Sequence, residues 1–215
     1  MTLPSREKRL KAEIIDLGKQ LVRLRLICAN VGNLSARLKC DTILITRRGS
    51  SLDNLKPPDI LKVDLSDKSA LKDRHLSSEF PLHSKIYRDF PHHKAIIHCH
   101  PPLTNAYFSV FSSLRILTVE AGVYLGRVPV IRQKTPTITD LKPVLAAFRN
   151  NNLVVIKNHG VVCAGSDFKK TLLLVETLES AVKVAALSRL FRQKKPDGVD
   201  KSIKQDLTRK ENGRN

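Results

Sequence analysis

The chain has 215 residues, of which 41% are hydrophobic and 27% are charged, and its formal net charge at pH 7 is +18. This length and composition favour one globular domain and exclude a chain that is disordered throughout. No run of about 20 apolar residues is present, so we expect no membrane-spanning helix. The segment Met1–Lys11 is polar and basic, without the apolar centre of a secretory signal. The four cysteines form no CxxC pair, which predicts reduced thiols in a cytoplasmic protein.

The positive charge is spread along the chain. Residues 1–25 carry seven basic and three acidic side chains, and residues 192–215 carry eight and four, so each segment has a net charge of +4. Only 5% of the residues are aromatic, and tryptophan is absent. A protein that binds nucleic acid usually concentrates its charge on one element and adds aromatic side chains for stacking. The distribution therefore argues against nucleic acid and favours small anionic substrates.

The spacing of apolar residues predicts helices interleaved with short strands. Apolar residues three and four apart indicate a helix, and alternation with period two indicates a strand. We expect Ser78 to be the N-cap of the second helix and Ser166 that of the last. The expected helices cover residues 5–27, 79–90, 103–111, 140–148 and 167–191. The expected extended segments cover residues 34–38, 42–46, 61–65, 94–99, 119–125, 128–131, 153–156 and 161–163.

Tight turns join several of the expected strands. Parallel strands need long crossover connections, so these turns predict antiparallel pairs. We therefore expect one α/β domain, residues 1–191, with helices packed on a mostly antiparallel sheet. Residues 192–215 are polar and highly charged, and we expect them to form a basic, flexible C-terminal tail.

His98 and His100 flank Cys99 at the end of an apolar strand. Residues two apart on a strand point to the same face, so both imidazoles can reach one metal ion. Three protein ligands and an open position are typical of catalytic zinc. The alternative is an ordinary pair of polar residues at a strand end. Cys99 points to the opposite face and is expected to be a buried core thiol.

A third histidine, His159, lies in the turn Asn158–Gly160 between two apolar strands. A simple type I′-like turn would explain the asparagine and the glycine through positive φ angles, but it would not explain a histidine between them. We therefore expect His159 to have a functional role. His75, His83, His92 and His93 have no strand partner at a suitable spacing, and we expect them on the surface.

Three further segments have the chemistry of an anion site. Ser77, Ser78 and Glu79 come at an expected helix start, where hydroxyls and free backbone N–H groups suit a phosphate. The loop of residues 47–50 is basic and contains Gly49, and Gly32 with Asn33 can offer backbone and amide donors. Each segment has a simpler interpretation, namely a helix cap, a solvated loop and a helix C-terminal turn.

Taken together, these segments resemble the class II aldolase/adducin family, in particular its fuculose-1-phosphate aldolase-type members. The matching motifs are Gly32-Asn33-Leu34-Ser35, Ile45-Thr46-Arg47-Arg48-Gly49, Ser77-Ser78-Glu79, His98-Cys99-His100 and Asn158-His159-Gly160. They occur in the family's order and approximate spacing, and the resemblance covers roughly residues 8–191.

The resemblance implies a three-layer α/β/α domain, a homotetramer with active sites between subunits, and one Zn²⁺ per chain. It implies that His98, His100 and His159 bind the metal, and that Glu79 is a metal ligand or the catalytic base. It also assigns the substrate phosphate to Asn33, Arg48, Gly49, Ser77 and Ser78. Arg48 stands where the family usually has a hydroxyl residue. The family's catalytic tyrosine has no match near residues 117–120, which leaves the proton donor open.

The implied reaction is retro-aldol cleavage of a phosphorylated ketose. A metal stabilises the resulting enediolate as a Lewis acid, and a carboxylate moves the proton. A glutamate at position 79, rather than the aspartate of related 4-epimerases, favours the aldolase branch. The alternatives are a methylthioribulose-1-phosphate dehydratase, a sugar-phosphate 4-epimerase, or an adducin-like interaction module without catalysis. The sequence does not name the sugar.

Overall fold

The computed structural model describes residues 4–27, 31–135 and 137–193. Their centre is a seven-stranded sheet with the order β3-β2-β1-β4-β7-β6-β5. The strands are β1 (Asn33–Lys39), β2 (Thr42–Thr46), β3 (Ile60–Asp64), β4 (Ala95–Cys99), β5 (Val130–Arg132), β6 (Leu153–Lys157) and β7 (Gly160–Gly165). Only β5 and β6 pair in parallel, and the other five pairs are antiparallel. The prediction of a mostly antiparallel sheet is confirmed.

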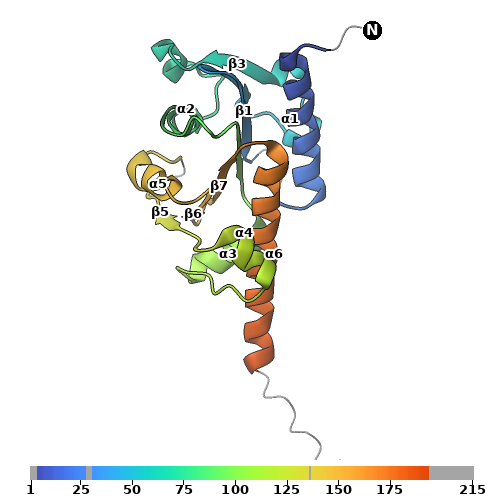
Figure 1. The fold of residues 1–215 in the computed structure, drawn as a ribbon, viewed down its shortest axis with the longest axis vertical. Helices are drawn as coiled ribbons and strands as arrows, with labels where there is room; N and C mark the ends of the chain where they lie inside the picture. Colours follow the sequence, from blue (N-terminus) through green and yellow to red (C-terminus); the bar gives the residue numbers. More distant parts are fainter. Residues whose placement is uncertain (1–3, 28–30, 136, 194–215) are drawn as a thin grey trace, which may run out of the picture.

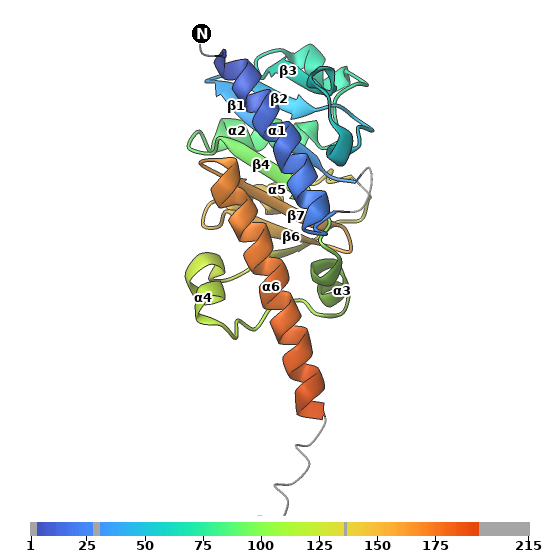
Figure 2. The same ribbon diagram turned by 90° about the vertical axis from the view of Figure 1, so that its right-hand side faces the viewer.

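Helices cover both faces of the sheet, giving three layers (Figure 1). Helices α1 (Arg6–Arg23) and α6 (Phe168–Gln193) lie on one face, and α2 (Phe80–Asp89) and α5 (Leu141–Phe148) lie on the other. Figure 2 shows α3 (Pro102–Val110) and α4 (Val119–Leu125) on either side of α6, which continues beyond the other described elements. Short 3₁₀ turns at Leu52–Asn54, Pro57–Asp59 and Lys68–Lys72 flank β3.

Each face of the sheet has its own apolar core. One core joins α1 and α6 to residues such as Leu34, Ile97 and Cys99, and the other contains Leu82, Ile86 and Ile96. Ile96 and Ile97 lie in different cores because successive strand residues face opposite ways. This alternation puts His98 on the side of α2 and α5, and it confirms that Cys99 is a buried core thiol on the opposite face.

Two of the expected elements are wrong in extent or in type. The first helix ends at Arg23, because Arg25 takes a φ of 58° and turns the chain so that Leu26 becomes buried, whereas Leu24 is 39% exposed. The segment 119–125 is helix α4 and not extended. The Thr118 hydroxyl accepts a hydrogen bond from the backbone N–H of Ala121, and this cap outweighs the strand propensity of the valines.

The remaining expectations concern the chain ends, caps and cysteines. Asp167, rather than Ser166, caps α6, because its carboxylate accepts from the backbone N–H of Lys170 at 2.8 Å. The expected tail, residues 192–215, lies outside the described residues, except for residues 192–193 at the end of α6. Cys40, Cys99 and Cys163 are free thiols, and Cys28 also falls outside the described part. In that part, no helix is long and apolar enough to span a membrane.

Candidate active site

Three imidazoles converge at the edge of the sheet formed by the strand ends, where β4 ends and β7 begins. β4 pairs with β7 in the register His98 to Val162 and Cys99 to Val161, so the turn that precedes β7 lies beside the end of β4. The Nε2 atom of His98 is 3.1 Å from Nε2 of His159 and 3.2 Å from Nε2 of His100. One ligand atom from each histidine lies within 4.8 Å of the other two. The expected convergence of His98, His100 and His159 is present.

The protonation of this cluster favours a cation. Nδ1 of His98 lies 3.0 Å from the carbonyl oxygen of Val161. A carbonyl only accepts, so Nδ1 donates and Nε2 keeps its lone pair for a ligand. Burial lowers the pKa of all three imidazoles. The pKa of His98 falls well below its usual value and that of His100 falls to about 4, and neighbouring histidines add to both of these shifts. The rings are therefore neutral at pH 7, the form in which histidine binds metals.

The spacing of the nitrogens also fits a tetrahedral ion. With nitrogen ligands at about 2.0–2.1 Å from zinc, tetrahedral geometry separates them by about 3.3 Å. The two Nε2 separations that involve His98, 3.1 and 3.2 Å, are close to that value. Crowding three ring nitrogens is unfavourable unless a cation or proton lies between them, so the residues present fit a divalent metal.

The turn that carries His159 is fixed from two sides. Asn158 has a φ of 61°, which confirms the need for positive φ there, whereas Gly160 serves close packing. A Cβ at Gly160 would clash with the Cys99 carbonyl and lie 2.9 Å from the His100 ring. On the other side, Nδ2 of Asn105, in α3, donates to the His159 carbonyl at 3.0 Å. Asn105 is a supporting residue that the sequence analysis missed.

Glu79 is buried but lies outside the histidine cluster. It is the N-cap residue of α2 and is 4% exposed. Oε1 accepts from the backbone N–H of Ile138 at 3.1 Å, and Oε2 is buried without a partner among the described residues. Burial raises the pKa of this carboxyl, with the Ile138 N–H opposing the shift. The carboxyl suits proton transfer, whereas its role as a metal ligand stays a prediction.

The expected anion-binding segments lie next to one another at the same edge of the sheet. Asn33 is opposite His98 in the β1–β4 register, and its Oδ1 is buried without a partner in the described structure. Arg47 forms an antiparallel backbone β-bridge with Leu76, and the backbone N–H of Arg48 donates to the carbonyl oxygen of His75 at 2.9 Å. The 47–49 loop therefore runs beside the segment that leads into Ser77.

The side chains of this group are less fixed than the histidines. Ser77 is buried, and its Oγ accepts from the backbone N–H of Glu79 at 3.2 Å. Ser78 is exposed and is not the N-cap, because α2 begins one residue later than expected, with Glu79 in that position. Arg48 and Gly49 are exposed, and Gly49 has a φ of 77°. Their role in phosphate binding stays a prediction.

The surface assignment is wrong for two of the four other histidines. His83 and His93 are buried, at 0% and 1% exposure, whereas His75 and His92 are exposed. Nδ1 of His83 lies 2.7 Å from Oγ of Ser35, and burial lowers the pKa of His83 to about 3. Its helical position, four residues after Glu79 and three before buried Ile86, is the signal that could have revealed it.

A comparison with known families covers most of the chain. The family described as "Class II Aldolase and Adducin N-terminal domain" matches residues 12–186. The chain therefore belongs to the class II aldolase/adducin family, as its motifs indicated.

Relatives of known name catalyse several reactions. An L-fuculose phosphate aldolase of Methanocaldococcus jannaschii is 30% identical over 183 residues, covering 85% of this chain and 99% of the relative. A 3-oxo-tetronate 4-phosphate decarboxylase of Pectobacterium atrosepticum is 30% identical over 190 residues, covering 84% and 85%. A methylthioribulose-1-phosphate dehydratase of Methylococcus capsulatus is 31% identical over 182 residues, covering 78% and 88%.

The solved structures give the same fold. The crystal structure of L-fuculose-1-phosphate aldolase from Thermus thermophilus superposes with a TM-score of 0.78 and 30% identity. The alignment covers 88% of this chain and 98% of that structure. The single flanked sheet described above is thus the class II aldolase fold.

Proposed function

We propose that the protein is a zinc-dependent aldehyde-lyase that cleaves a phosphorylated ketose by retro-aldol chemistry. The observation that supports this most is the convergence of three neutral imidazoles, His98, His100 and His159, at the edge where Asn33 and Ser77 also lie. The names of the M. jannaschii and T. thermophilus relatives make a fuculose-phosphate-like substrate the first choice.

The three histidines would hold the ion, and a bound divalent metal supplies Lewis acidity to a substrate carbonyl. The chain's own proton carrier is Glu79. In retro-aldol cleavage the hydroxyl that becomes the aldehyde loses its proton, which the Glu79 carboxylate can accept. The carbon–carbon bond that breaks leaves an electron pair on the other fragment, which must take up a proton. A buried carboxyl with a raised pKa holds a proton long enough to deliver it to that carbon. The unpartnered Oε2 is the oxygen that is free to do so.

Phosphate recognition falls to the neighbouring segments. The backbone N–H groups near the start of α2 and the Ser77 and Ser78 hydroxyls offer donors to a phosphate. The Asn33 amide and Gly49 would complete the site. Arg48 adds a guanidinium that binds phosphate oxygens in pairs, and it would replace the hydroxyl that the family usually has in this loop.

Metal analysis of the purified protein, followed by a panel of sugar phosphates, tests this proposal. We expect one divalent metal per chain and release of an aldehyde from a phosphorylated ketose, lost on chelation and restored by zinc. Fuculose 1-phosphate is the first substrate and the unphosphorylated sugar is the control. A metal-loaded protein that releases no aldehyde from any member of the panel would exclude the lyase assignment.

Decarboxylation and dehydration are the second candidates, because relatives about equally similar have those names. Loss of carbon dioxide from a 3-oxo acid phosphate leaves the same kind of electron pair beside a carbonyl, so the same residues would serve. A product lighter than the substrate by carbon dioxide or by water, with no aldehyde, would select one of these reactions. An isomeric sugar phosphate as the product would indicate a 4-epimerase. A protein with full metal content and no turnover would indicate an adducin-like module.

We also propose that the protein is a homotetramer and that it is cytoplasmic. Several large apolar side chains on α3, α4 and the end of α6 are exposed, among them Val110 at 69%, Val119 at 80%, Val123 at 74% and Phe191 at 72%. Apolar surface of this kind is typical of subunit contacts. Light scattering after size-exclusion chromatography tests the assembly, and a monomer at micromolar concentration would exclude it.

A further inference from the structure

A cavity of about 610 Å³ lies at the opposite edge of the sheet from the histidines. Lys39 ends β1 and Lys94 precedes β4, whereas Asn33 and His98 mark the other ends of these strands. Four residues of strand separate Lys94 from His98, which is about 13 Å. The cavity is within the usual size range of small-molecule sites, and the proposed lyase reaction does not use it.

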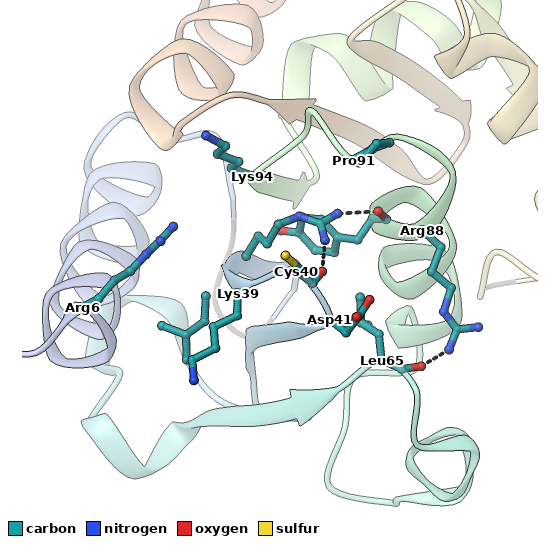
Figure 3. Close-up of a pocket in the computed structure, with 11 residues that line it drawn as sticks. Arg6, Lys39, Cys40, Asp41, Leu65, Arg88, Pro91 and Lys94 are labelled. Atoms are coloured by element: carbon teal, nitrogen blue, oxygen red, sulfur yellow. Dashed lines mark hydrogen bonds between the residues drawn. The ribbon is translucent and has the colours of Figure 1, made fainter.

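Basic side chains dominate the lining of this cavity. Five of them line it, against one carboxylate, that of Asp41. Figure 3 shows Arg6 from α1, Lys39 from β1 and Lys94 from before β4 around one part of the cavity, and Arg88 with Asp41 at another. The fifth basic residue is Arg37.

None of the five cations is in an ion pair with a carboxylate among residues 4–27, 31–135 and 137–193. The ion pairs that these residues do form involve other lysines, namely Lys11, Lys62, Lys85 and Lys170. The lining therefore has a net charge of about +4 with no carboxylate paired to its cations, in a chain whose net charge is +18.

Two of the cations are held in place by neutral groups. Arg37 donates from Nη1 and Nη2 to the backbone oxygens of Cys40 and Tyr87, and from Nε to that of His93 at 3.2 Å. Its guanidinium also stacks on the Tyr87 ring, 4.9 Å from the centroid. Arg88 donates to the backbone oxygen of Leu65. Carbonyl oxygens fix the position of these guanidiniums but leave their full charge uncompensated, so the cavity has a preorganised positive field.

The other three cations are exposed and adjustable. Arg6, Lys39 and Lys94 are exposed and reach the cavity from three separate elements. Long cationic side chains of this kind can close around an anion once it is bound. The exposed side chain of Pro91 also lines the cavity and can contact an organic group.

We propose that this cavity binds a small molecule with a diphosphate or triphosphate group, at a site separate from the histidine cluster. One phosphate, with about two negative charges, neutralises only half of the lining, whereas a diphosphate nearly balances it. The inference stands on this cavity alone and does not depend on the proposed lyase activity.

Cys40 provides a local readout, because its exposed thiol lines the cavity. Full-length, metal-free protein would be treated with neutral iodoacetamide, with and without inorganic pyrophosphate or ADP, at constant ionic strength. Trypsin cleaves after Lys39 and Arg47, so mass spectrometry of the peptide 40–47 reports Cys40 separately from the other cysteines. At an anion concentration ten times its Kd, alkylation of Cys40 should slow by about tenfold.

Two variants of equal charge complete the test. Lys39→Ala/Lys94→Ala should weaken protection by pyrophosphate or ADP by about tenfold or more, because two charge-assisted contacts are lost. In this variant trypsin cleaves after Arg37 and not after residue 39, so Cys40 is followed in the peptide 38–47. Lys142→Ala/Lys183→Ala removes two exposed lysines from α5 and α6, outside the cavity lining, and should leave protection unchanged. Stronger protection by ADP than by pyrophosphate would mean that the cavity also binds the organic group, for example at Pro91, and equal protection would assign binding to the diphosphate alone.

Three results would overturn the proposal. They are unchanged Cys40 alkylation at millimolar pyrophosphate and ADP, equal loss of protection in both double variants, and equal protection by sodium sulfate at the same ionic strength. The last of these would mean that the cations attract any anion without forming a site.

Discussion

The histidine cluster and the anion-binding segments occupy the same edge of the sheet, yet they are held differently. His98 and His159 are placed by the paired strands β4 and β7, and their Nε2 atoms already lie 3.1 Å apart. Arg48 and Ser78, in contrast, are exposed, and in the described structure no side-chain hydrogen bond fixes either of them. Strand pairing therefore forms the histidine cluster before any ligand arrives, whereas Arg48 and Ser78, proposed to bind phosphate, are not held in place by the fold.

The largest expected effect comes from removing the central imidazole. His98→Ala should reduce the metal content from about one per chain to near zero, because two histidines alone do not make a tight zinc site. Turnover should fall by more than about 10⁴-fold, as no other group supplies Lewis acidity. Plasma mass spectrometry measures the metal, and His92→Ala, an exposed histidine outside the cluster, is the control. Full metal content in His98→Ala would rule out the cluster as the binding site.

Glu79→Gln should have the next largest effect. The amide keeps the hydrogen bond from Ile138 but cannot carry the proton, so turnover should fall by roughly 10²–10⁴-fold while the metal content stays near that of the parent protein. Turnover and metal content, measured together, separate a role in proton transfer from a role in metal binding. Loss of metal along with activity would instead make Glu79 a ligand, and unchanged turnover would remove it from the reaction.

An intermediate effect concerns stability and pH. Burial lowers the folded-state pKa of His83 to about 3, below its unfolded value near 6.5. The unfolded chain then binds more protons between these values, so stability is full above about pH 6.5 and is lost as the pH falls, by up to about 1.4 kcal/mol per pH unit for this residue.

Urea unfolding of metal-free protein at pH 7, 6 and 5 measures this slope. The metal is left out because acid also releases it from its ligands, which would add a pH dependence of its own. His83→Gln can keep a hydrogen bond to Ser35 and should show a smaller loss between pH 6 and 5. Identical slopes for the two proteins would show that His83 does not contribute.

The smallest effect is expected at the exposed loop. Arg48→Ala should raise KM for a phosphorylated substrate by about two- to fivefold and leave kcat nearly unchanged, because exposed charge pairs contribute up to about 1 kcal/mol. The unphosphorylated sugar should be unaffected, and Arg74→Ala, also exposed, is the matched control. Equal changes in KM with both sugars, or no change with either, would mean that Arg48 is a solvated residue that does not bind the phosphate.

The sequence predicted best what depends on local periodicity. The alternation along β4 and the residue that follows it put His98 and His100 on one face, and the turn residues around His159 drew attention to the third histidine. Burial was harder to predict where it depends on the packing of distant elements. His83 is buried because α2 packs onto the sheet beside Ser35, 48 residues earlier in the chain. The apolar residues of α4 likewise indicated a strand, since the Thr118 cap is a weak local signal.

The pairing of β4 with β1 and β7 has a consequence for when the three histidines come together during folding. His98 lies opposite Asn33 on one side and Val162 on the other, so both contacts join segments more than 60 residues apart. Non-local pairings of this kind form late, because a long loop must close before they are made. During synthesis, a chain that lacks residues 153–165 has no third imidazole in position. The histidine cluster therefore forms only after the middle of the sheet closes. If the cluster holds the proposed ion, the rate of metal binding during refolding reports when that closure occurs.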